Sequence, residues 1–180
     1  MGLGNPGRRY AGTRHNVGFE VAEALAERWS LPRGKQRFGA LVSEGRAGPR
    51  GPRVALLLPQ TYMNEAGRSV GPARGSYRVA LERVLVIHDE IDLPFGDVRI
   101  RTGGGLAGHN GLKSVAAELG SREFARVRVG VGRPESTNPD VVAAYVLGPF
   151  REPVEEVREL VARGSDAAEA AIADAARPSP

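Results

Sequence analysis

The stretch from His88 to Gly111 decides the fold, because it contains a strand end, a turn and the start of a helix. Its first nine residues read His-Asp-Glu-Ile-Asp-Leu-Pro-Phe-Gly, and they follow the apolar run Val-Leu-Val-Ile at 84–87. A short apolar run bounded by turn residues is typical of a buried strand. Asp89 is therefore predicted at the carboxyl end of a central strand, where open α/β sheets bind their ligands.

The last nine residues of the stretch read Gly-Gly-Gly-Leu-Ala-Gly-His-Asn-Gly, a glycine-rich turn that leads into a helix predicted over 108–119. The turn places His109 and Asn110 at a helix start, which favours anionic groups. A fixed carboxylate and a polar helix start are half of an active site. A base is expected from another part of the chain.

Composition narrows the class of protein. The 180 residues are 41% hydrophobic and 26% charged, which predicts one globular domain over residues 1–180. Because there is no cysteine, disulfides, zinc–thiolate sites and cysteine nucleophiles are excluded. No apolar run approaches the roughly 20 residues of a membrane span, and no signal-peptide core is present, so we expect a cytoplasmic protein. The net charge of +4 favours an anionic partner.

Strand and helix patterns alternate along the chain and predict an α/β fold of three layers, with a mixed, twisted central sheet flanked by helices. Pro72 is expected to kink or break the second helix. The predicted strands cover 38–42, 54–58, 84–87, 96–101 and 124–132. The predicted helices cover 17–29, 66–77, 108–119, 139–147 and, at the carboxyl end, about 152–176.

The first loop supplies the expected base. His15 lies just before the helix over 17–29, with Asn5 and Tyr10 nearby in sequence, and Asp89 could orient its imidazole. The glycines of residues 2–7 match the dinucleotide-binding pattern G-x-G-x-x-G. That function is disfavoured because no helix opens on the last glycine, so a tight turn is predicted instead.

A serine-hydrolase alternative rests on Gly-Arg-Ser-Val-Gly at 67–71, which matches G-x-S-x-G and precedes Asp89 and His109 in the order of an α/β-hydrolase triad. The context disfavours this alternative. A nucleophile elbow needs a strand that ends directly at the motif, whereas the preceding strand ends near Leu58 and Ser69 falls inside a helix.

The candidate residues suit ester hydrolysis by activated water. A carboxylate at Asp89 would select the tautomer of His15, so that the free ring nitrogen could take a proton from water. Asn5, Asn64 and Asn110 are neutral amides that could hold carbonyl groups or a developing oxyanion. Each asparagine also lies in a predicted turn, where backbone conformation alone explains it. The histidines lack the spacing of metal ligands, so neither a metal nor another cofactor is expected.

Basic residues surround the glycine-rich turn in sequence. Such clusters predict a polyanionic substrate such as nucleic acid, although a solvated strand face is the commoner explanation. The residues are Arg99, Arg101, Lys113, Arg126, Arg128 and Arg133.

Over about residues 2–160 the sequence resembles bacterial-type peptidyl-tRNA hydrolases. The motifs are Gly-Leu-Gly-Asn-Pro-Gly at 2–7, Tyr10 with Thr-Arg-His-Asn-Val-Gly-Phe at 13–19, Pro-Gln-Thr-Tyr-Met-Asn at 59–64, and the segments 88–96 and 103–114. The resemblance implies a monomeric, cytosolic enzyme that cleaves the ester between a peptide and the terminal ribose of tRNA, and so recycles tRNA from aborted translation.

The resemblance also implies residue roles. His15 would be the base, Asp89 would hold it, and Asn5 would distinguish an acylated α-amine from a free one. The residues Tyr10, Tyr62, Asn64 and Asn110 would line the substrate groove. Arg101 and Arg128 match positions that clamp the 5′-phosphate of tRNA, the first of which is commonly lysine.

Two departures and one alternative remain open. Family members usually have an apolar strand before the first motif, whereas here only Met1 precedes it. Either the true start lies upstream, or the sheet lacks support beneath Asn5 and His15. Ala66 replaces a usual serine and is expected to be tolerated.

The alternative function is that of a non-catalytic RNA-binding relative with the same fold. Residues 133–150 are expected to form a mobile flap over the groove.

Overall fold

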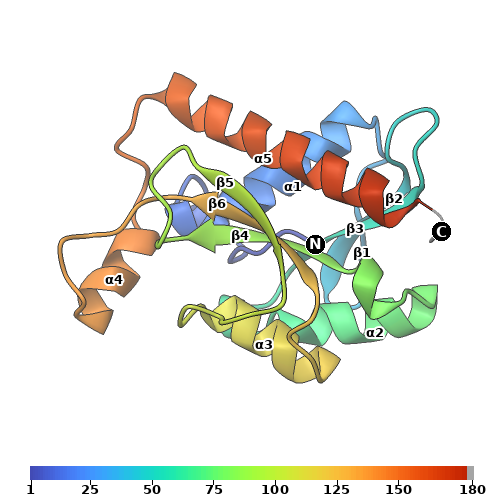
Figure 1. The fold of residues 1–180 in the computed structure, drawn as a ribbon, viewed down its shortest axis with the longest axis horizontal. Helices are drawn as coiled ribbons and strands as arrows, with labels where there is room; N and C mark the ends of the chain where they lie inside the picture. The colour runs from blue at the N-terminus through green and yellow to red at the C-terminus, as the bar shows by residue number, and fades with distance from the viewer. Residues whose placement is uncertain (178–180) are drawn as a thin grey trace.

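The computed structural model describes residues 1–177 and has the predicted α/β architecture (Figure 1). The predicted domain over 1–180 includes residues 178–180, which lie outside this description. The strands are β1 (Lys35–Arg37), β2 (Ala40–Arg46), β3 (Arg53–Pro59), β4 (Leu85–Glu90), β5 (Val98–Thr102) and β6 (Ala125–Gly130). The α-helices are α1 (Val17–Arg28), α2 (Gly67–Tyr77), α3 (Asn110–Leu119), α4 (Pro139–Val146) and α5 (Val154–Ala175). Short 3-10 turns include η1 (Arg8–Tyr10), η2 (Arg14–Asn16) and η3 (Met63–Glu65).

The strands form two three-stranded sheets, in the orders β1-β2-β3 and β4-β6-β5. β4 and β6 are parallel, and the other pairs are antiparallel. The first residues of the chain join the two sheets. The Gly2 amide donates to the Leu57 carbonyl at 3.0 Å, and the Leu3 amide donates to the Ile87 carbonyl at 2.9 Å. This segment therefore supplies backbone support directly before Asn5, although it forms only a short bridge.

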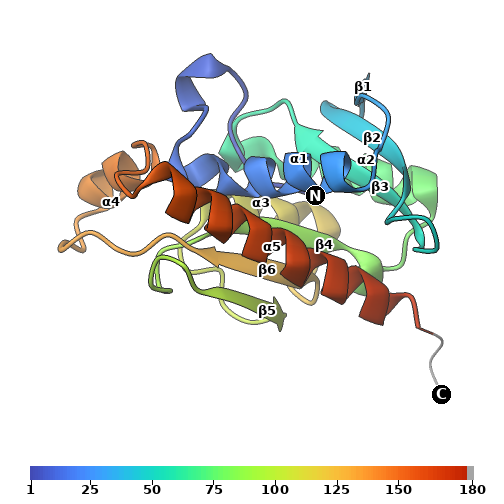
Figure 2. The same ribbon diagram turned by 90° about the horizontal axis from the view of Figure 1, so that it is seen from above.

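Helices cover both faces of the sheet. α1 and α5 lie on one face, and α2 and α3 lie on the other (Figures 1 and 2). α4 projects beyond the carboxyl end of β4, beside the 3-10 turn that precedes α1 (Figure 1). No helix among residues 1–177 is both long and apolar enough to cross a bilayer.

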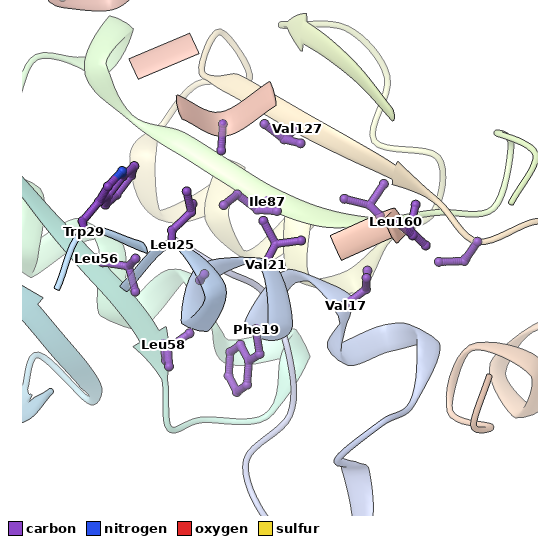
Figure 3. Packing of buried hydrophobic residues seen from close by; sticks show 14 residues of the cluster. Val17, Phe19, Val21, Leu25, Trp29, Leu56, Leu58, Ile87, Val127 and Leu160 are labelled. Carbon is purple, nitrogen blue, oxygen red and sulfur yellow. The ribbon is translucent and has the colours of Figure 1, made fainter. Parts of the chain in front are cut away.

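The larger core lies between α1, the sheet and α5 (Figure 3). Val17, Val21 and Leu25 point from one side of α1 towards Ile87 of β4 and Leu160 of α5, and all of these side chains are buried. The spacing of four residues puts them on one helix face. Each such side chain contributes about 1.5–3 kcal/mol when fully buried, so this stripe fixes α1 on the sheet.

Two predicted elements need correction. The predicted strand over 38–42 is wrong at its start, because Phe38 and Gly39 form the tight turn between β1 and β2, with φ values of 55° and 65°. Positive φ at both central residues is typical of a two-residue hairpin turn. The helix break at Pro72 is also wrong. α2 runs through that residue without interruption. The helix is held against α3, because the Gly67 amide donates a hydrogen bond to the Ser114 hydroxyl at 2.9 Å.

Gly18 lies at the closest approach between α1 and the sheet. A Cβ added there would lie 2.6 Å from the Leu3 carbonyl oxygen and still closer to that of Ile87. Because the Leu3 amide donates to this same Ile87 carbonyl, an alanine would disturb the backbone junction of the two sheets.

We expect Gly18→Ala to lower the free energy of unfolding by about 3 kcal/mol, because the new methyl group displaces packed backbone rather than a flexible side chain. Gly75 in α2 provides the matched control, since an added Cβ there meets nothing within 4 Å. Gly75→Ala should stabilise the protein by about 0.5–1 kcal/mol. Urea unfolding followed by circular dichroism measures both changes, and equal stability of the two variants would contradict the expectation.

Candidate active site

The structure brings the predicted base and the predicted acid into contact. His15 lies on η2, and Asp89 is the penultimate residue of β4. Nδ1 of His15 and Oδ1 of Asp89 are 2.9 Å apart. The Asp89 side chain is 2% exposed and that of His15 is 13% exposed. A carboxylate is an acceptor only, so Nδ1 carries the proton and Nε2 keeps a lone pair. Among the described residues, no hydrogen bond occupies that Nε2.

His109 adds a second imidazole, for which the sequence suggested a catalytic role only in the disfavoured serine-hydrolase alternative. It is the N-cap of α3, and its Nδ1 accepts from the amides of Gly111 at 3.1 Å and Leu112 at 3.3 Å. Nδ1 must therefore be unprotonated, which places the proton on Nε2. Nε2 then donates to Oδ1 of Asp89 at 3.0 Å. Oδ1 of Asp89 thus accepts hydrogen bonds from the imidazoles of both His15 and His109.

The shared hydrogen bonds affect the protonation of both His15 and Asp89. Burial lowers the pKa of His15, but the charge of Asp89 and its hydrogen bond outweigh burial and raise the pKa above the ordinary 6.5. Burial alone would raise the pKa of Asp89, yet the two histidines lower it well below its usual range, so Asp89 stays ionised. The raised pKa of His15 stabilises the fold below about pH 6.5, and this contribution is lost as the pH rises through the folded-state value.

His88 is buried beside His15 and His109. Its Nδ1 donates to the carbonyl of Asp89 at 2.7 Å, and its ring meets that of His109 edge-on with centroids 5.1 Å apart. Burial, followed by the neighbouring His109, lowers the pKa of His88 to about 3. His88 therefore stays neutral near pH 7. Its contribution to stability is complete above about pH 6.5 and is lost as the pH falls towards 3.

Asn5 is held from two sides. Its backbone amide donates to Oδ1 of Asn16, and Nδ2 of Asn16 donates back to the Asn5 carbonyl, both at 2.9 Å. Its side-chain Oδ1 accepts from the Met63 amide at 2.8 Å. Oδ1 thus already accepts one hydrogen bond, whereas Nδ2 has no partner within residues 1–177 and is free to donate to a ligand. No sequence pattern indicated the role of Asn16, because its contacts form only in the folded chain.

The other predicted groove residues lie on loops and helix starts at this edge of the sheet. Tyr10 ends η1 and is half-buried, whereas Tyr62, just before η3, is 57% exposed. Asn64 in η3 and Asn110 at the start of α3 are both exposed. η3 packs against α3, so the two amides come from neighbouring elements. Among residues 1–177, neither side-chain amide forms a hydrogen bond.

His15, Asp89 and His109 could also be considered as metal ligands, because their candidate atoms lie within 4.8 Å of one another. Spacing along the sequence did not indicate this cluster. The tautomer of His109 disfavours a metal, since Nε2 carries the proton while Nδ1 accepts two backbone hydrogen bonds. Coordination through Nε2 would require a proton on Nδ1, which would then face two N–H donors.

The two arginines expected to bind phosphate share one face of the β5–β6 pair. Arg128 is paired across the strands with Arg99, and Arg101 with Arg126, so Arg101 and Arg128 are diagonal neighbours. Nε of Arg128 donates to Oε2 of Glu90 at 3.0 Å, which fixes its orientation. Arg101 is exposed and forms no ion pair within residues 1–177.

Arg126 requires a correction to the predicted basic surface. It is 1% exposed, and its guanidinium donates to the carbonyl of Gly105 at 2.9 Å and to that of Gly103. Arg126 lies on the same strand face as Arg128, but the glycine-rich turn folds over the Arg126 side chain and covers it. Arg126 therefore holds the turn in place and is not available to a polyanion.

Ser69 does not have the environment of a nucleophile. It lies inside α2, is fully buried, and donates its hydroxyl hydrogen to the Gly39 carbonyl at 3.2 Å. The Gly-Arg-Ser-Val-Gly segment is therefore a helix segment rather than a nucleophile elbow, as its sequence context indicated.

Comparison with known proteins identifies the family. The sequence model of the family described as peptidyl-tRNA hydrolase matches residues 1–178. The chain belongs to this family. The peptidyl-tRNA hydrolase of Mycobacterium sp. (strain KMS) is 52% identical over 181 residues, which cover 99% of this chain and 92% of the relative. That of Geobacillus thermodenitrificans (strain NG80-2) is 46% identical over 173 residues, covering 96% of this chain and 91% of the relative.

Solved structures agree with the family assignment. The crystal structure of peptidyl-tRNA hydrolase from Acinetobacter baumannii matches with a TM-score of 0.79 at 36% identity, and it covers 97% of this chain and 91% of that one. A mutant of the same enzyme matches with a TM-score of 0.83 at 39% identity, covering 97% and 87%. The resemblance inferred from the sequence motifs and the α/β fold class are therefore both confirmed.

The contact with Asp89 gives a direct prediction for His15 in this peptidyl-tRNA hydrolase family member. Asp89→Asn removes the charge that raises the pKa of His15 but leaves the burial that lowers it. The pKa of His15 should therefore fall from above 6.5 to below 6.5. NMR titration of the imidazole resonances measures this change, with His15→Gln used to assign the signal. An unchanged midpoint would show that Asp89 does not hold this ring in solution.

Proposed function

We propose that this chain is an enzyme that hydrolyses the ester between a peptide, or an N-blocked amino acid, and the terminal ribose of tRNA. Water is activated by His15, which is held by Asp89. The observation that carries the proposal is the 2.9 Å contact between Nδ1 of His15 and Asp89 in a chain of this family. This contact leaves Nε2 of His15 as the basic atom.

The first step forms a bond between water and the ester carbonyl. Nε2 of His15 takes a proton from water while the water oxygen attacks the carbonyl carbon. The carbonyl oxygen becomes an oxyanion, and the exposed amides of Asn64 and Asn110 are the candidate donors to it. Because Asp89 remains ionised beside Nδ1, the imidazolium that forms at His15 is stabilised.

The second step breaks the ester bond. The oxyanion reforms the carbonyl, and the ribose oxygen leaves as it takes the proton from Nε2 of the His15 imidazolium. The products are a peptide with a free carboxylic acid, which then loses its proton to solvent, and a tRNA with a free terminal hydroxyl. His15 returns to its neutral form, so the step needs no oxidant, reductant or second substrate.

Asn5 would recognise an acylated α-amine. With Oδ1 held by the Met63 amide, Nδ2 of Asn5 presents a hydrogen-bond donor. A donor can bind the carbonyl of an acylated amine but cannot accept a hydrogen bond from a free ammonium group. This asymmetry would disfavour ordinary aminoacyl-tRNA, which carries the free ammonium group.

Tyr10 and Tyr62 would complete the groove for the substrate, and Arg101 with Arg128 would bind the 5′-phosphate of tRNA. Arginine suits phosphate because its planar fork donates two parallel hydrogen bonds. Arg128 is already oriented by Glu90, whereas the exposed Arg101 is the flexible member. We also propose that the enzyme acts without a metal or other cofactor, as a single-domain monomer in the cytoplasm.

The proposed activity is tested by release of N-acetylated amino acid from tRNA. His15→Ala should lower kcat about a thousandfold, because it removes the base. Binding of uncharged tRNA, measured by fluorescence anisotropy, should change by less than about twofold, since the base adds little ground-state binding. Ser69→Ala is the control and should retain full activity, because its hydroxyl only bonds to the Gly39 carbonyl.

The outcomes separate the alternative functions. If the wild-type protein binds tRNA but releases nothing, the chain is a non-catalytic RNA-binding relative. If Ser69→Ala abolishes release while the fold is preserved, the serine-hydrolase alternative is restored. If His15→Ala retains wild-type kcat, another residue is the base.

The phosphate clamp gives a separate prediction. Arg101→Ala should weaken tRNA binding and reduce the slope of log affinity against log salt by about one, because one phosphate contact is lost. Arg158→Ala on α5 is the matched control, since that arginine is exposed and its ion pair within residues 1–177 is with Glu155. Anisotropy titrations between low and high salt measure both slopes. An unchanged slope for Arg101→Ala would exclude Arg101 from the phosphate contacts.

A further inference from the structure

We propose that Arg14 is a positioning residue for the reaction, because its side chain connects the turn that carries His15 to residues 145–152 at the end of α4. This inference rests on the proposed function for its effect on catalysis. Its effect on the placement of the His15 ring can be measured without substrate.

Arg14 is 3% exposed, and its guanidinium is surrounded by the segment 145–152. Nη1 donates to the Pro149 carbonyl at 2.6 Å, and Nη2 contacts the Glu152 carboxylate at 3.2 Å. The guanidinium also lies over the ring of Tyr145, 4.2 Å from its centroid, and 5.4 Å from that of Phe150. A single side chain therefore contacts the carbonyl, the carboxylate and the two aromatic rings.

Backbone contacts join the same two segments. The Arg14 amide donates to the Gly148 carbonyl at 3.1 Å, and the Phe150 amide donates to the Gly12 carbonyl at 3.4 Å. Thr13 and Pro149 form an isolated antiparallel bridge between these hydrogen bonds. The turn before His15 is therefore paired with the residues that follow α4.

The end of α4 is tied in turn to the strand that carries Asp89. The Tyr145 hydroxyl donates to the Val131 carbonyl at 2.7 Å, and the Val131 amide donates to the Glu90 carbonyl at 3.1 Å. These contacts lead from Arg14 through Tyr145 and Val131 to Glu90 of β4, which is next to Asp89 in sequence. The contact between Asp89 and His15 closes the ring, because His15 is next to Arg14. Arg14 therefore helps to set how far the imidazole lies from the carboxylate.

Stability alone is a weak explanation for an arginine at this position. Nε of Arg14 has no partner within residues 1–177, although it is buried. A buried charge with an unsatisfied donor carries a desolvation cost, and apolar replacements for buried ion pairs often stabilise proteins. What an apolar side chain cannot supply is the fixed geometry of several directed contacts. The contacts of Arg14 therefore favour a role in orientation.

The test uses two variants and a control on the full-length protein. Arg14→Lys keeps the charge but loses the planar fork, and Glu152→Gln keeps a hydrogen-bond acceptor but removes the ion pair. Arg28→Lys is the matched control. Arg28 lies at the other end of α1 and pairs with Asp166 and Glu169 of α5, away from His15. Measurements are kcat and KM for N-acetylaminoacyl-tRNA, and the NMR titration of His15.

We expect Arg14→Lys to lower kcat about tenfold while KM changes by less than about twofold, since ring alignment affects the chemical step more than binding. Glu152→Gln should show a smaller effect in the same direction. Loosening the His15–Asp89 contact should also move the pKa of His15 down towards 6.5 in both variants. Arg28→Lys should change neither quantity, even where thermal unfolding shows a similar loss of stability.

Three results would overturn the proposal: wild-type kcat and His15 midpoint in folded Arg14→Lys, the same changes in Arg28→Lys, or a fall in thermal stability alone. If Arg14→Lys does not fold, Glu152→Gln decides by the same measurements. If the wild-type protein lacks hydrolase activity, the proposed function fails but the His15 midpoint still tests the positioning role.

Discussion

The structure depends on one carboxylate oxygen that accepts hydrogen bonds from two imidazoles. Oδ1 of Asp89 lies 2.9 Å from Nδ1 of His15 and 3.0 Å from Nε2 of His109. Three elements meet at this atom, because β4 ends there, α1 follows the turn of His15, and α3 begins beside His109. A buried carboxylate without such donors would favour its neutral form. The two N–H groups keep it ionised, and its charge then fixes what both rings can do.

Three histidine rings lie close together near this oxygen, but they differ in burial and in hydrogen bonding. His88 is buried, its Nε2 has no hydrogen-bond partner within residues 1–177, and its pKa of about 3 keeps it neutral. The Nδ1 atom of His109 is occupied by two backbone amides of α3. His15 has a raised pKa, a partly exposed ring and an Nε2 atom without a hydrogen-bond partner among the described residues. Backbone hydrogen bonds and burial thus select one base from three chemically identical side chains.

The sequence could predict the meeting of His15 and Asp89 because strand ends and helix starts share one edge of an α/β sheet. It could not predict that His109 shares the same oxygen, because this requires the ring to reach back from its N-cap position. Arg126 shows a second limit. Alternation along β6 assigns a side chain to a face but does not reveal that the turn 103–105 covers that face. Pro72 shows a third, since packing against α3 maintains a helix that local preference would break.

The residues on either side of His15 explain how a short turn can hold a base accurately. Arg14 and Asn16 are both buried, and each reaches a different part of the chain. Asn16 holds the backbone of Asn5 through two hydrogen bonds, whereas Arg14 holds the segment after α4. Within one turn of 3-10 helix, the flanking side chains point into the protein and the middle one points at the site. A turn of three residues has little rigidity of its own, so its accuracy must come from these two anchors rather than from its own hydrogen bonds.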